Sequence, residues 1–199
     1  MTGYFELLDR YGILGILRLV RDIIASRLVF RNVRLIRYPW YVRGARFIAF
    51  GQGFTSGVGL RADAFGTSER QIVFGKNVQV GDYVHIAAMG SVSIGDNVLM
   101  ASKVYISDHD HGVYVGEGKR VTHPCERQVD RALNTAPVRI GDNVWIGEGV
   151  SILKGVEIGN NSVIGAASVV TKSVPEDSIV VGNPRRSHFP RFESVNLYR

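Results

Sequence analysis

The chain has 199 residues, of which 45% are apolar and 21% charged, and its formal net charge is +6. This composition is typical of a globular domain and excludes a disordered chain. A single cysteine, Cys125, cannot form an intrachain disulfide, which favours a reducing compartment such as the cytoplasm. Arg18, Arg21, Asp22 and Arg27 interrupt the apolar first forty residues, so we expect neither a signal peptide nor a membrane-spanning helix.

The net positive charge is concentrated in residues 1–46. Nine arginines there face three acidic residues, whereas the rest of the chain carries fifteen charges of each sign. This pattern predicts a helix from about Tyr4 to Val29 that seeks an anionic or apolar surface. Arginines lie on the same side of the predicted helix as several leucines, so its apolar stripe is interrupted. Two roles of the helix therefore stay open: peripheral inner-membrane contact through residues 1–37, and packing on the protein itself. Few aromatic residues alternate with the basic ones, which disfavours nucleic acid as a partner.

From Phe74 onward, apolar residues recur with a period of six. In the second half of the chain, two positions per unit are aliphatic or small: Ile140, Ile146, Ile152, Ile158, Ile164 and Val170, and four residues after each, Val144, Val150, Val156, Ser162, Ser168 and Val174. An upstream block from Phe74 to Ile106 follows the same rule once a two-residue insertion between 84 and 92 is allowed. Such units close a triangular prism every ~18 residues, so we predict a mainly β protein, a parallel β-helix with these side chains inside.

Glycines 141, 147, 159 and 165 follow the first inward residue of their units. We expect them at corners, in the left-handed conformation that glycine and asparagine adopt at least cost.

The repeat breaks after Ile106. Its next inward position is occupied by Asp110, and the period returns only at Ile140. Residues 112–137 are therefore expected to leave the prism as a long loop, which is often functional. We expect three parts: a basic helical segment over 1–46, a β-helix over 47–186 that contains this loop, and a tail over 187–199.

Two runs of sequence, SVSIGDNVLMASKVYISDHDH and APVRIGDNVWIGEGVSILKGVEIGNNSVIGAASVVTKSVP, followed by VVGNPRR, resemble the hexapeptide-repeat acyltransferases. The similarity is strongest to the galactoside, maltose and O-antigen acetyltransferase branch and covers residues 72–186. It implies a left-handed β-helix, a homotrimer, acetyl-CoA as the donor and a sugar or glycan hydroxyl as the acceptor, in O-antigen or capsule-like polysaccharide biosynthesis.

Matching the first run without a gap places the family's general base on His111. A neutral imidazole can accept a proton from a hydroxyl at physiological pH. His109 is the alternative base. His123, in an HP dipeptide, is a weaker candidate because it lies inside the loop, where no repeat defines its position. Gly112 replaces the proline that follows the histidine in the galactoside and maltose enzymes.

For the acceptor, the resemblance suggests His85, Trp145 and Asp108. The repeat count puts His85 and His111 on different faces of one chain, so a neighbouring subunit would have to bring them together. His85 could instead be a solvated corner residue, Trp145 could pack under the loop, and Asp108 could shape the corner beside His109.

For acetyl-CoA, the positions that match the family's donor contacts are Ala166, Thr171, Lys172 and Arg186, with Arg185 as an extra charge. Coenzyme A carries phosphates that such cations would bind. Each of these residues could also be an ordinary surface residue. No metal is expected to be required.

Two other functions stay open. The γ-class zinc carbonic anhydrases share this prism and need three well-placed histidines, but the spacing of His85, His109 and His111 does not resemble theirs. A non-catalytic β-helix scaffold is the other alternative. We expect the protein in the cytoplasm, with or without peripheral attachment to the inner membrane.

Overall fold

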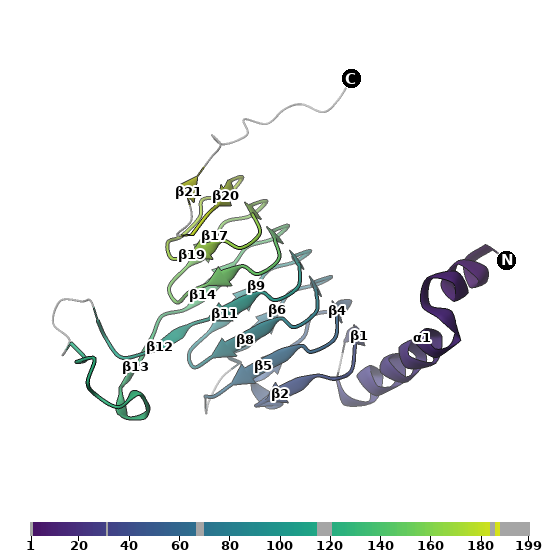
Figure 1. Ribbon diagram of the computed structural model, residues 1–199, viewed down its shortest axis with the longest axis horizontal. Coiled ribbons are helices and arrows are strands. Elements are labelled where there is room, and N and C mark those ends of the chain that lie inside the picture. The colour runs from purple at the N-terminus through teal and green to yellow at the C-terminus, as the bar shows by residue number, and fades with distance from the viewer. Residues whose placement is uncertain (1, 31, 67–69, 115–120, 184–185, 188–199) are drawn as a thin grey trace, which may run out of the picture.

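The computed structural model describes residues 2–30, 32–66, 70–114, 121–183 and 186–187. It has one N-terminal helix beside a long prism of short strands, from which one hairpin projects (Figure 1). The strands stack in parallel from coil to coil, which confirms the predicted β-helix.

Three sheets form the faces of the prism. The eight-stranded face contains β1 (Val33–Ile36), β4 (Phe54–Ser56), β7 (Gln79–Val80), β10 (Leu99–Met100), β15 (Trp145–Ile146), β18 (Val163–Ile164), β20 (Ile179–Val181) and β21 (Arg186–Ser187). The six-stranded face contains β2 (Tyr41–Arg43), β5 (Arg61–Ala64), β8 (His85–Ala88), β11 (Tyr105–Ser107), β16 (Ser151–Ile152) and β19 (Val169–Val170). The five-stranded face contains β3 (Ile48–Ala49), β6 (Ile72–Phe74), β9 (Val92–Ile94), β14 (Val138–Ile140) and β17 (Glu157–Ile158).

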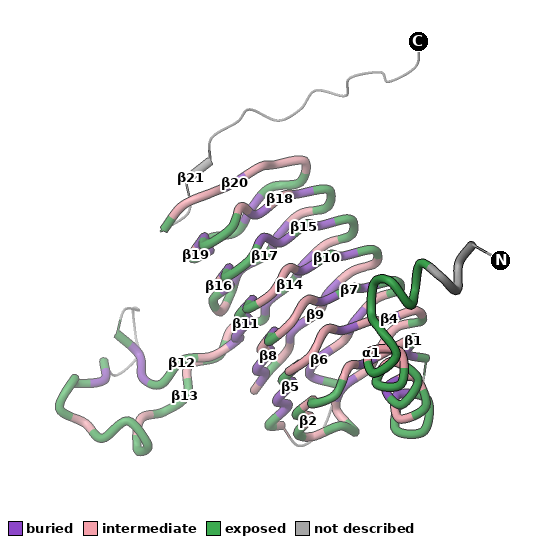
Figure 2. The backbone as a smooth tube through the Cα atoms, turned by 45° about the vertical axis from the view of Figure 1, so that its right-hand side comes forward, coloured by how far each residue is buried: buried purple, intermediate pink, exposed green. Residues whose placement is uncertain are grey.

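The predicted inward positions form the core. The aliphatic and small residues of both repeat blocks are buried, and they stack as one continuous column along the prism. Figure 2 shows this buried column along the strands, with exposed residues at the corners. The two-residue insertion falls after Ile86, because Ile86 pairs with Ile106 and Val92 pairs with Val138.

The corner glycines differ from the prediction in their conformation. Left-handed backbone angles occur two residues later in each unit, at Asn143 (φ 55°) and Gly149 (φ 67°), for example. Gly147 is required for another reason: a Cβ there would lie 2.5 Å from the backbone nitrogen of Ala166 in the next coil. Glycine at these positions therefore permits the close stacking of coils.

Helix α1 spans Thr2–Val29 and is kinked at Gly12 (φ 61°, ψ 173°). It packs on β1 through Ser26, which is fully buried. The Ser26 hydroxyl donates to the carbonyl of Asp22 (2.6 Å) and accepts from the N–H of Ile36 (2.7 Å). Strands β1 and β2 and the 3-10 helix η1 (Ala45–Phe47) already belong to the prism, which therefore starts before the predicted boundary at residue 47.

The long loop leaves the prism earlier than predicted. Strand β12 (His109–His111) already pairs with β13 (Leu133–Thr135) in an antiparallel hairpin outside the three faces, and the 3-10 helix η2 (Gln128–Asp130) lies between these strands in the sequence. The hairpin projects from the end of β11 (Figure 1). The expectation that Asp110 fills an inward position is wrong: its side chain is 49% exposed, and the fully buried carboxylate is that of Asp108.

Candidate active site

The six-stranded face brings the acidic and imidazole side chains together. In its ladder, Arg61 pairs with His85, and His85 pairs with Tyr105 in the next coil. Strand β11 then leads directly to Asp108 and His109 at the corner toward the five-stranded face. We call this line of corners, with the described residues 65–66, 70–71, 89–91, 108–114, 121–137, 153–156 and 171–173, the exit edge.

Asp108 holds this corner together. Its Oδ1 accepts from the N–H of Met89 (2.9 Å), and its Oδ2 accepts from the N–H of Gly90 (2.7 Å), so it anchors the insertion in the preceding coil. Oδ1 also lies 2.9 Å from Nδ1 of His109. Asp108 is thus fully buried, and both of its oxygens have partners within the protein.

His109 and His111 have different environments. The side chain of His109 is 13% exposed, bonded to Asp108 and in edge contact with Phe65 (ring centroids 6.3 Å apart). His111 is exposed on β12, and its side chain has no hydrogen bond or ion pair to any other described residue. Lys154 lies 3.4 Å from Asp110, which ties β12 to the next corner of the exit edge.

Sequence reasoning missed a second buried carboxylate, Asp63. It is 1% exposed, and its Oδ2 accepts from Nε of Arg61 (2.6 Å) and lies 3.2 Å from Nε2 of His85. Arg43 lies 3.5 Å from Oδ1. The one signal in the sequence is a charged residue between two alanines, in a run that otherwise reads as a small-residue strand.

Burial is the main reason that the pKa of His85 is lowered from its ordinary value. The charge of Arg61 and, to a smaller extent, that of His109 lower it further, while the hydrogen bond and charge of Asp63 partly offset this shift. His85 is therefore neutral at physiological pH. The repeat count puts His85 and His111 on different faces of the prism, but only His85 lies on a face, because His111 belongs to the hairpin outside the three faces.

A groove on the six-stranded face begins beside His85 and runs toward the first coil. It has a volume of about 620 Å³ and is lined by Trp40, Tyr41, Val42, Arg43, Gly59, Arg61, Tyr83 and His85.

The other predicted residues divide between two edges of the prism. Thr171 and Lys172 are exposed on the exit edge, on the same side as His109. Trp145, 54% exposed, lies on the eight-stranded face, and Ala166 follows β18 at the corner between that face and the six-stranded one. Arg186 lies in β21, where its backbone pairs with Val181. Arg185 is outside the described residues. One chain therefore does not bring Trp145 and Ala166 together with the histidines.

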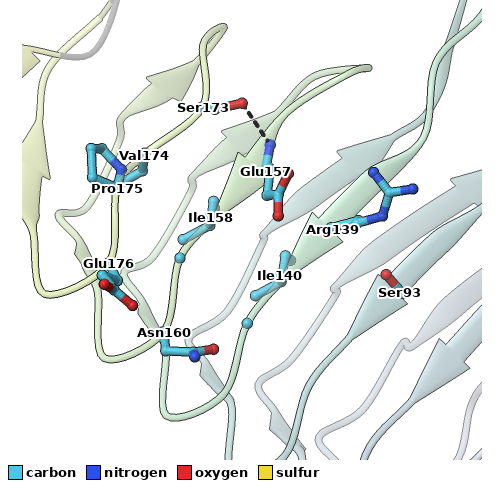
Figure 3. A pocket seen from close by; sticks show the side chains of 12 residues that line it. Ser93, Arg139, Ile140, Glu157, Ile158, Asn160, Ser173, Val174, Pro175 and Glu176 are labelled. Carbon is cyan, nitrogen blue, oxygen red and sulfur yellow. Dashed lines mark hydrogen bonds between the residues drawn. The ribbon is translucent and has the colours of Figure 1, made fainter.

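A hollow of about 700 Å³ lies on the five-stranded face (Figure 3). Its side chains come from successive coils, with Arg139 paired to Glu157 in the strand register and Ser173 Oγ accepting from the N–H of Glu157 (3.0 Å). Its described lining residues include no histidine.

Among the described residues, no three side chains of His, Cys, Asp or Glu gather into a group that could hold a metal ion. Within the same residues, no helix is long and apolar enough to cross a membrane.

Known proteins similar to this chain share its prism. Residues 137–172 match the family described as "Bacterial transferase hexapeptide (six repeats)". The chain is 48% identical over 181 residues to a protein of Escherichia coli named "Putative lipopolysaccharide biosynthesis O-acetyl transferase WbbJ", and the match covers 91% of each chain.

Two solved structures extend the comparison. A maltose O-acetyltransferase from Clostridium difficile is 32% identical and superposes with a TM-score of 0.58, over 73% of this chain and 70% of its own. A galactoside acetyltransferase in complex with coenzyme A is 33% identical, with a TM-score of 0.53 over 68% of this chain and 64% of its own.

Proposed function

The chain belongs to the hexapeptide-repeat acetyltransferases, and from that premise we propose that it transfers the acetyl group of acetyl-CoA to a sugar hydroxyl during surface polysaccharide biosynthesis. The observation that carries this proposal is the placement of two imidazoles at the exit edge. Thr171 and Lys172 lie on the same edge toward the C-terminal coils, and the groove beside His85 runs toward the N-terminal coils. Donor and acceptor thus approach the histidines from opposite ends.

In the proposed reaction, the hydroxyl oxygen of the sugar attacks the thioester carbonyl of acetyl-CoA. An imidazole takes the hydroxyl proton, the C–S bond breaks, and the coenzyme A sulfur leaves with a proton returned by the imidazolium. The products are the acetyl ester and free coenzyme A. Lys172 and Arg186 supply cations for the phosphates of coenzyme A.

We assign the base to His111. Its imidazole is exposed on β12, where a substrate can reach it. Asp110, next to it, lies 3.4 Å from Lys154, which links the base of the projecting hairpin to the following coil of the prism. His109 and Asp108 then position the start of this strand.

One observation favours a second assignment. The Nδ1 of His109 lies 2.9 Å from the buried carboxylate of Asp108. A carboxylate at Nδ1 holds an imidazole in the tautomer whose Nε2 accepts a proton. Turnover of the two single variants, His111→Ala and His109→Ala, distinguishes these assignments.

We propose that the active assembly is a homotrimer. Trp145 and Ala166 lie on the far side of the six-stranded face from the exit edge. A second copy that packs its eight-stranded face toward the exit edge would bring these residues to the histidines and form a complete site between subunits. A measured mass of one subunit in solution would contradict this arrangement.

We also propose that α1 lies on the surface of the inner membrane. Its outward row consists of Ile13, Leu17, Val20, Ile24 and Leu28, which are 48–80% exposed. Arg18, Arg21 and Arg27 are on the same helix. An exposed apolar row on an arginine-rich helix is the pattern of helices that bind anionic lipid surfaces.

The function is tested by incubating the purified protein with acetyl-CoA and a panel of nucleotide sugars, oligosaccharides and lipid-linked glycans while free thiol is measured. Sugar-dependent thiol release, with the acetyl ester found by mass spectrometry, is expected. Release that no sugar stimulates would contradict the proposed function.

A further inference from the structure

The groove on the six-stranded face has the composition of a site for a charged sugar. Tyr41 and Tyr83, each 60% exposed, offer aromatic surface to a sugar ring. Arg43 and Arg61 lie in the same groove, with side chains 66% and 45% exposed. With His85 neutral, two guanidinium charges and the one carboxylate of Asp63 leave the groove with a charge of +1.

Both arginines lie beside the buried carboxylate of Asp63, yet most of their donors have no acceptor among the described residues. Arg61 donates through Nε to Asp63, and no described residue accepts from its terminal nitrogens. Arg43 lies at ion-pair distance from Oδ1 of Asp63 without forming a hydrogen bond to it. The guanidinium of Arg61 is fixed at Nε with its terminal nitrogens directed to no described acceptor, and that of Arg43 lies nearby, so together they are suited to binding a carboxylate or phosphate.

We propose that this groove is an acceptor subsite for an acidic sugar, whose carboxylate or phosphate pairs with Arg43 and Arg61 while its ring packs on Tyr41 or Tyr83. The proposal rests on the proposed function, because the groove begins at His85 and leads away from the exit edge. The proposed acceptor is an anionic glycan that extends from the histidines toward the first coil and α1.

Binding is measured first, without turnover, by titrating the full-length protein with glucuronic acid, glucose 1-phosphate and neutral methyl glucoside. Both acidic sugars are expected to bind at least about tenfold more tightly than the neutral one, and their ratio distinguishes carboxylate from phosphate. Arg43→Gln should remove about tenfold of this preference, which corresponds to one charge-assisted pair. Arg43→Lys, which keeps the charge, should retain part of it.

Arg34→Gln is the matched control. Arg34 is exposed on β1, in the same coil but on the eight-stranded face, so its loss changes the net charge equally and should leave the preference intact. In turnover with an acidic acceptor, Arg43→Gln should raise KM and leave kcat unchanged. Arg61→Gln serves as a second variant, whose amide can still donate to Asp63.

Several results would overturn the proposal. Equal affinity of the wild type for acidic and neutral sugars would do so. A second such result is an Arg43→Gln variant that loses thermal stability or trimer mass but keeps the preference for acidic sugars, because the arginines would then only pair with Asp63 or contact another subunit. Acidic sugars that bind while only neutral sugars are acetylated would also overturn it, because the groove would then not serve an acceptor. A protein that binds acidic sugars with this preference but acetylates no sugar at all would instead contradict the proposed function and leave the groove as an anion-binding site.

Discussion

The regular coils from residue 138 to 174 and the interrupted coil around Asp108 obey different rules. In the regular coils, each inward side chain is aliphatic or a small serine, and the charged side chains point outward from the strands and corners. In the interrupted coil, a fully buried carboxylate occupies the corner, and the chain leaves the prism for 27 residues, from His109 to Thr135. The comparison shows that regular repeats build a rigid scaffold, whereas the break in the repeat places ionisable side chains where substrates can reach them.

The largest effect is expected from a charge inside the regular coils. Val150 is fully buried in the column, so Val150→Asp would bury an unpaired carboxylate and should prevent folding or lower Tm by well over 10 °C. Ser151→Asp, one residue later on the outward side of β16, should melt near the wild type. Circular dichroism melts of both variants test this, and a Val150→Asp protein that melts within about a degree of the wild type would disprove the inward register.

A smaller effect is expected at the buried carboxylate of the interrupted coil. Asp108→Asn would replace one acceptor oxygen by an amide donor that faces the backbone N–H of Met89 or Gly90, and the free energy of unfolding should fall by about 1.5–3 kcal/mol. Asp110→Asn breaks only a surface ion pair with Lys154 and should cost less than about 1 kcal/mol. Denaturant unfolding compares the two, and equal losses would mean that Asp108 does not hold the corner.

The outward row of α1 is exposed, whereas the opposite side of the helix is attached to β1 through the buried Ser26. Because deleting the helix would uncover β1, point substitution is the sharper test. Leu17→Glu with Ile24→Glu should abolish sedimentation with anionic vesicles at low salt, while kcat on a water-soluble acceptor stays unchanged. Val129→Glu, an equally polar change at an exposed site in the hairpin, should have no effect. Wild-type protein that stays in the supernatant would remove the membrane proposal.

The smallest effect concerns His85. Its pKa in the folded protein is lowered, so the unfolded chain binds more protons than the folded one near and below the ordinary value of 6.5. Stability should therefore fall as pH decreases through this range, and His85→Gln should make the fall less steep. NMR titration of the imidazole gives the direction of the pKa shift directly, and an upward shift would contradict the burial described for this residue.

The inward register could be predicted because it depends only on a local period of six. The exit point could not, because the pairing of β12 with β13 joins segments about 25 residues apart and draws the chain out of the prism before Asp110. The cluster at Asp63 was missed for a similar reason. Arg61 and His85 are 24 residues apart, whereas His85 and Tyr105 are 20 apart, so irregular coil lengths conceal the ladder.

The N-terminal boundary was predicted too late for a related reason. Strands β1 and β2 belong to the prism, but the coil they begin lacks the six-residue period that reveals the later ones. An aromatic cluster fills the prism there: Phe54 contacts Phe74 (ring centroids 4.7 Å apart), and Phe30 of the chain leaving α1 contacts Trp40 (5.0 Å). Because large aromatic rings fill the interior with fewer residues than aliphatic side chains do, these residues are irregularly spaced and show no six-residue period.

We propose that an imidazole at the exit edge, that of His111, removes the proton of the acceptor hydroxyl. The most direct test is kcat for acetyl transfer by His111→Ala and His109→Ala, with bound metal measured in the wild type. A general base contributes typically about 10²- to 10⁴-fold, so His111→Ala should lower kcat by that factor with little change in the KM for acetyl-CoA, and His109→Ala should lose much less. A larger loss in His109→Ala would transfer the role to the imidazole paired with Asp108, and equal losses with stoichiometric zinc in the wild type would contradict the acetyltransferase mechanism.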